Sequence, residues 1–504
     1  MSEVLTISYQ LAELPSAQHR AGLAGLIFMV RWLKRIGHEG ICEIEKLTAN
    51  GASFKVNRQG LEALISEIYA CEEIEIDDKK AFLPKGSQVS DLDPTQDKLW
   101  LKLWRDFLWA LLKQPASRTI FKNDEGGKGN KSRQKAIQDC WEQLKGKKNS
   151  VDLAGTEFLG AQAKNTEIVP FKDRGKSQFL LRFWVYAVQI YDPIYLIRRK
   201  DKYQPKSAGY AIVIPDVANL EYFCDEFLDA LKESRERNQQ PHWYFKSRPH
   251  QAVINLAPAA GLDFLRTLRE QLARRSKNLD DIVLAVEVCL LSVSDDGQKN
   301  SIDELVRLDP QGKQIDEFAR VRENCRNLLF VTQRLKNIIA KQPWYFGFGK
   351  LCSSLKIEQI FNPESLFCRD AKESFKLEVN DLSTIKSEPD ELISLEALIY
   401  DMVGSYISKK VAEKYGLEWE KVKGDEETKK GYNEKRRKIA QDAFYGFRSR
   451  SDIEFSKYFA LTFGSVQQSY VLNNKTSFER LAQALYNDTE YIKSLTLLAL
   501  SARS

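Results

Sequence analysis

Apolar residues follow one spacing in the first part of this chain and another in the rest. Up to about residue 217, short apolar runs bounded by glycine and proline predict strands, and helical stretches lie between them. An amphipathic stretch over 93–115 predicts a helix whose Trp100, Trp104 and Trp109 pack in a core. Farther on, apolar positions recur every three or four residues. The helices predicted there are 219–237, 261–277 and 315–342, and from Ser394 the chain is almost wholly helical.

The region 177–217 carries the clearest strand pattern. Asp192-Pro193 is typical of a turn and predicts a hairpin at that point. A basic tip over 198–206 and an apolar strand over 209–215 follow.

A chain of 504 residues is too long for a single core. We therefore predict an α+β protein with a mixed α/β N-terminal part, which contains the basic hairpin, and a C-terminal helical bundle. The expected divisions are an N-terminal α/β segment over 1–95, an α/β domain of the same lobe over 96–350, a linker over 351–393 and the bundle over 394–504.

The segment "LPSAQHRAGLAGLIFMV" is the most unusual apolar run. Ten uncharged residues precede Arg31, which is too short for a transmembrane helix of about 20 residues. Ser16 as N-cap and Gly37 as the stop instead predict a helix. Its small residues Ala17, Ala21 and Gly25 recur every fourth position, and this stripe favours close packing against another backbone.

Composition excludes several kinds of chemistry. The eight cysteines form no CxxC pair and, with no secretion signal, indicate reduced core thiols and a cytoplasmic location. The four histidines are not grouped at metal-ligand spacing. The stretch "PFKDRGKS" ends like a phosphate-binding loop, but Pro170 replaces its first glycine. We therefore expect no metal, no cofactor and no enzymatic activity.

Positive charge is concentrated in three places. Residues 118–148 hold nine Lys or Arg against four acids, and 428–450 hold eight against two; 198–206 is the third. One such run is usually a solvated face. Together, and mixed with Tyr, Phe, Asn and Gly, they indicate several contacts to nucleic acid.

The N-terminal motif resembles the opening segment of the large subunit of type I CRISPR surveillance complexes (Cascade), in the MYXAN-type branch. The residues that carry the resemblance are Leu14, Pro15, Ala17, Gln18, His19, Arg20, Ala21, Gly22, Leu23, Ala24 and Gly25. A second, weaker match covers 209–223.

The resemblance implies a non-catalytic subunit that recognises the protospacer-adjacent motif (PAM) in duplex DNA and stabilises the R-loop. The implied system serves antiviral defence or RNA-guided transposition. The implied partners are crRNA, target double-stranded DNA, the backbone and crRNA-handle subunits, a small subunit, and a helicase-nuclease or a transposition target-selector protein. No membrane is implied.

The family motif does not assign DNA-reading residues, so these are predicted from loop chemistry. The PAM-side candidates are Asn123, Lys128, Asn130, Lys131 and Arg133. The backbone-contacting candidates are Arg198, Arg199, Lys200, Lys202, Lys435, Arg436, Arg437, Lys438, Arg448 and Arg450.

Gln18, His19 and Arg20 are predicted either to anchor crRNA or a neighbouring subunit, or to be satisfied polar residues of the core. Two other functions remain open for the chain. The first is a structural scaffold that binds crRNA or acidic protein partners without recognising DNA. The second is a nuclease, against which the sparse histidines argue.

Overall fold

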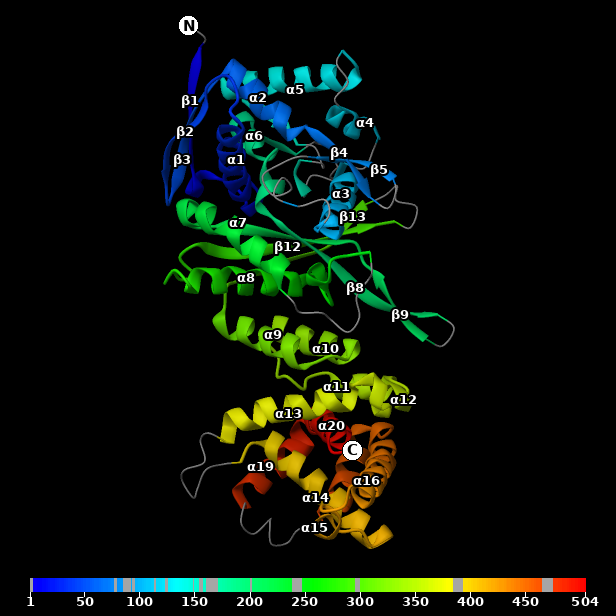
Figure 1. Cartoon of the computed structure of the whole chain (residues 1–504). Coiled ribbons are helices and arrows are strands. Elements are labelled where there is room, and N and C mark those ends of the chain that lie inside the picture. The colour runs from blue at the N-terminus through cyan, green and yellow to red at the C-terminus, as the bar shows by residue number, and fades with distance from the viewer. Residues whose placement is uncertain are drawn as a thin grey trace. The chain divides into compact units, whose positions relative to one another are not determined.

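A computed structural model describes residues 3–76, 79–84, 92, 96–112, 115–122, 126–147, 149–153, 157–159, 171–199, 202–237, 247–294, 300–383, 393–464 and 475–504. The chain forms two compact units, Met1–Asp316 and Glu317–Ser504 (Figure 1). Each is described by itself.

The N-terminal unit opens with a small antiparallel sheet in the order β1-β3-β2. Asn57 caps the helix that follows β3 by accepting a hydrogen bond from the backbone N–H of Gly60. The elements are β1 (Val4–Gln10), β2 (Cys42–Thr48), β3 (Gly51–Asn57), α1 (Ala17–Ile36) and α2 (Arg58–Ile68).

Helix α1 confirms the predicted start and stop. Ser16 accepts a hydrogen bond from the backbone N–H of His19, and Gly37 ends the helix with a φ of 69°. A Cβ built at Gly25 would lie 2.0 Å from the carbonyl oxygen of Phe183, and one at Gly22 would lie 2.4 Å from that of Leu180. The predicted close packing is therefore confirmed at Gly25, and Gly22 is a second contact point.

The central sheet of this unit has the strand order β11-β8-β10-β12-β13, with β9 paired to β8. Every residue of β10 is buried, because α1 and α8 cover opposite faces of the sheet (Figure 1). Its elements are β8 (Gln189–Arg199), β9 (Lys202–Ser207), β10 (Tyr210–Val217), β11 (Val253–Ile254), β12 (Val283–Val293), β13 (Asn300–Leu308), α7 (Leu220–Glu236) and α8 (Ala257–Ala273).

The predicted turn at Asp192-Pro193 is wrong. Both residues lie inside β8, where that strand changes partner: Tyr191 pairs with Ala211 of β10, whereas Ile194 pairs with Ser207 of β9. The Asp192 carboxylate is buried and accepts hydrogen bonds from Ser207 and Arg248. Tertiary partners thus stabilise an Asp-Pro pair within a strand.

Further elements complete the N-terminal unit. Trp100 and Trp104 of α3 are buried as predicted. Trp109 is only partly buried, and the guanidinium of Arg118 lies over its ring. The elements are β4 (Cys71–Ile76), β5 (Lys79–Pro84), α3 (Lys98–Leu112), α4 (Pro115–Arg118), η2 (Thr119–Phe121), α5 (Lys128–Leu144), β6 (Ser150–Asp152), β7 (Lys172–Arg174), α6 (Gly175–Leu180), η4 (Trp184–Ala187) and η5 (His250–Ala252).

The helix predicted over 315–342 is two helices, α9 (Gly312–Asn324) and α10 (Leu328–Ile339). Asn327 caps α10. The buried carboxylate of Asp370 accepts hydrogen bonds from the backbone N–H groups of Arg326 and Asn327. The spacing of apolar residues does not predict this break between α9 and α10, because Asp370, which stabilises it, lies more than forty residues farther along the chain.

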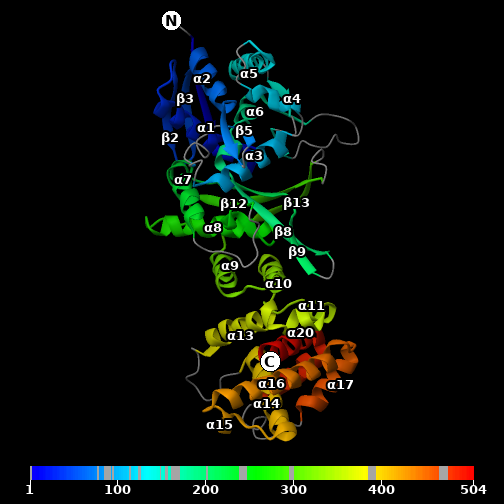
Figure 2. The same cartoon turned by 45° about the vertical axis from the view of Figure 1, so that its right-hand side comes forward.

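The C-terminal unit is a bundle around α20 (Thr489–Ala502), whose residues from Ile492 to Ala502 are all buried (Figure 2). Its buried polar side chains have partners inside the bundle: Lys493 donates to the carbonyl oxygen of Arg450, and the hydroxyls of Thr496 and Ser501 donate to carbonyl oxygens four residues earlier. Its other helices are α11 (Phe348–Ser354), α12 (Ile357–Phe361), η6 (Pro363–Ser365), α13 (Phe367–Ser383), α14 (Leu395–Tyr415), α15 (Trp419–Val422), α16 (Glu426–Arg448), α17 (Asp452–Phe463) and α19 (Lys475–Asn487).

The predicted α+β class, with a mixed N-terminal part and a helical C-terminal region, is confirmed. The stretch predicted as a linker over 351–393 is corrected: α11, α12 and α13 occupy 348–383, and α11 and α13 pack against α20. Residues 384–392 lie outside the described residues. Within the ranges described above, no helix is long and apolar enough to cross a membrane.

Candidate nucleic-acid interface

Helix α16 carries the densest positive charge of the C-terminal unit. Asp425 caps its start by accepting from the backbone N–H of Thr428. Tyr432, Ile439 and Phe444 are buried on the inner side of the helix. Arg437 and Lys438 lie on the outer side of the helix.

The cations of α16 differ in their environment. Arg437 and Lys438 are exposed, and neither has a carboxylate within ion-pair distance among the described residues. Lys435 lies 5.2 Å from the ring centre of Tyr415 on α14, which it contacts as a cation–π pair. Their charge is therefore not neutralised by described carboxylates.

Arg436 is a half-buried cation without an acid. Its Nε atom is buried and has no hydrogen-bond partner, and no ion pair joins it to a described residue. Burial lowers the pKa of its guanidinium, and the nearby charge of Arg503 lowers the pKa further. A desolvated, unpaired cation is unfavourable in the isolated chain and becomes favourable when an anion binds.

Arg448 and Arg450 have structural partners. Arg448 donates to the carbonyl oxygens of Ser353 and Leu355, at 2.8 and 2.9 Å, and so fixes the end of α11. Arg450 donates to the carbonyl oxygen of Gly446 and lies 3.9 Å from the ring centre of Tyr458. Their contribution to a nucleic-acid surface stays a prediction.

The second cluster lies at the start of α5. The PAM-side candidates were predicted from loop chemistry, which is wrong from Lys128 onward, because α5 begins there. Gly129 permits the first turn to approach the carbonyls of Thr119 and Lys122 closely: a Cβ there would lie 2.6 to 2.7 Å from their oxygens. Asn123 lies outside the described residues.

Lys128 and Lys131 are exposed on the first turns of α5, and Asn130 is half-buried. The N-cap is Gly127, which has no side chain to accept a hydrogen bond from the first N–H groups of the helix. Arg133 instead points inward and donates to the carbonyl oxygens of Ile120 and Lys122. Of this cluster, the two lysines are the most accessible to a ligand.

The third cluster lies on the β8–β9 ribbon. Backbone pairs Arg198↔Tyr203 and Arg199↔Lys202 place these residues at the free end of the ribbon, which projects from the sheet (Figures 1 and 2). Lys200 lies outside the described residues, and the side chains of Arg198, Arg199 and Lys202 are not described. The two views place α5 and this end of the ribbon at opposite ends of the N-terminal unit, so the fold does not bring the two clusters together.

Gln18, His19 and Arg20 bind within the fold. Gln18 donates to the carbonyl oxygen of Glu157 at 2.7 Å and accepts from the N–H of Leu159. The two ring nitrogens of His19 lie 2.7 Å from Ser16 Oγ and 2.8 Å from Asp173 Oδ2. These contacts agree with the alternative of a satisfied core histidine.

Arg20 joins α1 to the central sheet. It donates to Asp216 of β10 and to the carbonyl oxygen of Leu11. Asp216 also binds Arg307 of β13, at 2.7 Å. A role of the Gln18, His19 and Arg20 trio in binding crRNA or another subunit stays a prediction.

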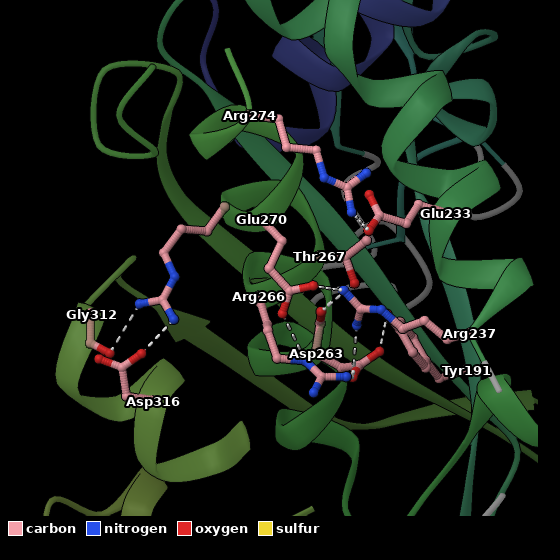
Figure 3. A network of polar contacts seen from close by, with 11 residues as sticks. Tyr191, Glu233, Arg237, Asp263, Arg266, Thr267, Glu270, Arg274, Gly312 and Asp316 are labelled. Carbon is pink, nitrogen blue, oxygen red and sulfur yellow. Dashed lines mark hydrogen bonds and ion pairs between the residues drawn. The ribbon is translucent and has the colours of Figure 1, made fainter. Parts of the chain in front are cut away.

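A group of arginines around α8 has the opposite character, because each has a carboxylate partner (Figure 3). Arg266, whose side chain is 4% exposed, donates to Asp263, which also accepts from the buried hydroxyl of Tyr191. The ion pairs are Arg237–Glu270 at 2.5 Å, Arg266–Asp263 at 3.1 Å, Arg269–Asp316 at 2.5 Å and Arg274–Glu233 at 2.6 Å.

Charge counting along the chain singled out 428–450 and not α8, but it did not show which cations are paired. Arg266 and Arg269 lie on α8 and Arg274 follows its end, whereas α16 carries seven Lys or Arg. Only the positions of the acids in the folded chain show which of these cations have a carboxylate partner. Sequence reasoning also missed Tyr415, because α14 and α16 bring it next to Lys435 from twenty residues away. No group of His, Cys, Asp or Glu in the described parts of the two units could hold a metal ion.

Comparison with protein families identifies the kind of protein to which this arrangement belongs. One family model, the type I-B CRISPR Cas8b N-terminal domain, matches residues 78–278. A second, the type I-B CRISPR Cas8b C-terminal domain, matches residues 283–503. The chain is therefore a large subunit of a type I CRISPR effector complex. More narrowly, it belongs to the type I-B Cas8b family, whose two domains it carries in order. No curated protein matches it.

Proposed function

We propose that this large subunit is non-catalytic, recognises PAM-containing duplex DNA and stabilises the R-loop. The observation that carries the proposal is the unneutralised charge of α16, where Arg436, Arg437 and Lys438 have no described carboxylate partner. Nucleic-acid phosphates are the polyanions that such a surface fits, and their binding releases counterions.

The start of α5 is the proposed PAM-side contact. A helix N-terminus presents unpaired N–H groups and the positive end of the helix dipole, which favours phosphate. Exposed Lys128 and Lys131 add charge at the same end. Asn130 supplies an amide, which can read a base edge in the major groove.

The proposed partners follow from membership in such a complex. They are crRNA, target DNA, the backbone and crRNA-handle subunits, the small subunit, and a helicase-nuclease or a transposition target-selector protein. We further propose a cytoplasmic location and the MYXAN-type branch, the latter on the motif from Leu14 to Gly25.

The test is PAM-dependent binding by the reconstituted complex. Lys128→Ala with Lys131→Ala should reduce affinity for PAM-containing duplex about tenfold at moderate salt while crRNA assembly persists, because the variant cannot neutralise two of the phosphates. The matched control is Lys135→Ala with Lys145→Ala, which removes the same charge farther along α5, where Lys145 already binds Glu3. The control should change affinity less than twofold.

Two results would contradict the proposal. Equal affinity of the unaltered complex for duplexes with and without a PAM would favour a scaffold that binds crRNA or acidic proteins. Metal-dependent cleavage of DNA by the purified subunit would contradict a non-catalytic role.

A further inference from the structure

The connection between α10 and α11 begins with a strained lysine. The N–H of Lys341 donates to the carbonyl of Ile338, and the N–H of Gln342 donates to that of Asn337. This is the Schellman arrangement, in which glycine usually holds the left-handed position. Here Lys341 holds it, with a φ of 53°, a conformation that is sterically unfavourable for a residue with a Cβ. Its side chain is exposed.

The next residues are held rigidly. Asn337 donates to the carbonyl oxygens of Trp344 and Phe346, at 2.8 and 2.9 Å, and Gln333 donates to that of Phe346 at 3.1 Å. Gly347 is required for this contact, because a Cβ there would lie 2.7 Å from the Gln333 amide nitrogen. The backbone around Phe346 is therefore fixed by amide side chains of α10.

The three aromatic residues of the connection differ in their surroundings: two rings pack against other aromatic rings, and the third is exposed. Trp344 packs edge-on against Phe375, with ring centres 5.1 Å apart. Tyr345 contacts the ring of Tyr491 at 4.5 Å. Phe346, between these anchored neighbours and α11, is 51% exposed. The connection thus holds one phenyl ring in solvent by fixing the residues around it.

The surroundings of Phe346 in the sequence contain no acid. Residues 324–357 include six Lys or Arg and no Asp or Glu. Arg334 is used internally, in an ion pair with Glu378, whereas Lys336 and Lys341 are exposed. Lys350 is exposed as well, but the Glu490 carboxylate lies close to it. This stretch is a fourth basic region, and charge counting along the chain did not single it out.

We propose that Phe346 is a stacking platform for one unpaired nucleobase, with the exposed lysines of 324–357 contacting the adjoining phosphates. An exposed aromatic ring held at a fixed position can stack on any base, and cations beside it bind the backbone. The left-handed backbone of Lys341, five residues before this ring, is a kind of strain that clusters at functional sites. The inference rests on the proposed nucleic-acid function and adds a base-contacting residue to it.

The experiment compares two single-stranded DNA oligomers of equal length, oligo(dT) and an abasic oligomer, binding to the full chain. Phe346→Ala should weaken binding of oligo(dT) about tenfold, since stacking stabilises each base by about 1–3 kcal/mol. Binding of the abasic oligomer should stay unchanged, because its phosphates are the same. Phe346→Trp should retain full affinity, and Phe346→Leu should behave as Phe346→Ala.

The matched control is Tyr486→Ala. Tyr486 is 71% exposed on α19 of the same unit, but residues 481–492 around it include no Lys or Arg. It should leave both affinities unchanged. Thermal unfolding should show intact folding for Phe346→Ala, because the ring is half exposed.

The possible failures are distinguishable. If the unaltered chain binds oligo(dT) and Phe346→Ala binds it equally well, the platform is overturned and the proposed function stands. An equal reduction in affinity for both oligomers would overturn base stacking in favour of a phosphate effect. Loss of assembly with the other subunits at unchanged oligomer affinity would assign Phe346 to a protein interface. If the unaltered chain binds neither oligomer, the platform and the single-strand binding of the proposed function both fail.

Discussion

Two groups of cations in this protein, the arginines around α8 and the basic cluster on α16, lie in opposite environments. Around α8, Arg237, Arg266, Arg269 and Arg274 each have a carboxylate partner (Figure 3). Along α16, Arg436, Arg437 and Lys438 have none among the described residues. The first group links α7, α8, β8 and Asp316 within the N-terminal unit, whereas the second leaves its charge for an external anion.

The comparison shows why the number of cations alone is a weak guide to binding. A cation with a carboxylate partner is already neutralised, and a phosphate must displace that partner to bind it. A cation that lacks one binds phosphate at no such cost. Local pairing therefore separates structural arginines from candidate ligand-binding ones.

The largest expected effect comes from breaking the α8 network. Asp263→Ala would leave Arg266 and the Tyr191 hydroxyl without their acceptor in the interior. We expect the free energy of unfolding of the N-terminal unit to fall by about 3–5 kcal/mol, as for a buried ion pair from which one partner is removed. Denaturant unfolding measures it.

Asp316→Ala is the matched control for that variant. Asp316 is 62% exposed and binds Arg269 at the surface, so its removal should cost less than about 1 kcal/mol. Equal destabilisation by the two variants would contradict the distinction between a buried and an exposed partner.

An effect on binding, without one on folding, is expected at α16. Arg437→Ala with Lys438→Ala should weaken R-loop retention about tenfold and make its salt dependence shallower, by about 0.7 in log–log slope for each single-strand phosphate that is no longer neutralised. Thermal stability should stay within about 0.5 kcal/mol, because both side chains are exposed. A change in stability alone would make the cluster merely structural.

The control for this pair removes the same charge from paired lysines. Lys421 and Lys423 of the same unit bind Glu418 and Glu420. Lys421→Ala with Lys423→Ala should leave the slope unchanged. Equal weakening by both double variants would show that net charge, and not pairing, decides binding.

The smallest effect is expected at Arg436. Arg436→Leu removes a half-buried, unpaired cation, so the free energy of unfolding should stay unchanged or rise by about 1 kcal/mol, while R-loop retention weakens. Arg266→Leu should instead destabilise, because Asp263 would lose its closest cation. Loss of stability in Arg436→Leu would show that an internal partner holds Arg436.

The sequence predicted the parts of the fold that depend on local patterns. Ser16 and Gly37 bound α1 as their chemistry indicates, and Gly25 packs against a backbone as its place in a small-residue stripe predicts. The apolar strand over 209–215 largely coincides with β10. These features depend on caps, periodicity and side-chain size, which neighbouring residues carry.

The predictions that failed depended on distant partners. Asp192-Pro193 resembles a turn, but Ser207 and Arg248 hold Asp192 inside a strand. Lys128 resembles a loop residue, but the close approach of Gly129 to η2 lets α5 begin there. Neither contact can be predicted from the residues that are adjacent in the sequence.

By itself, the sequence determined the α+β class, the helical C-terminal region, the basic clusters and the family resemblance, since composition, periodicity and a local motif carry them. Only the tertiary structure decided which cations are neutralised and which aromatic ring is held in solvent. Both depend on groups that folding brings together. Asp263 lies beside Arg237 and Tyr191, and Asn337 holds the carbonyl before Gly347. Pairing and desolvation act through space, so spacing along the chain does not encode them directly.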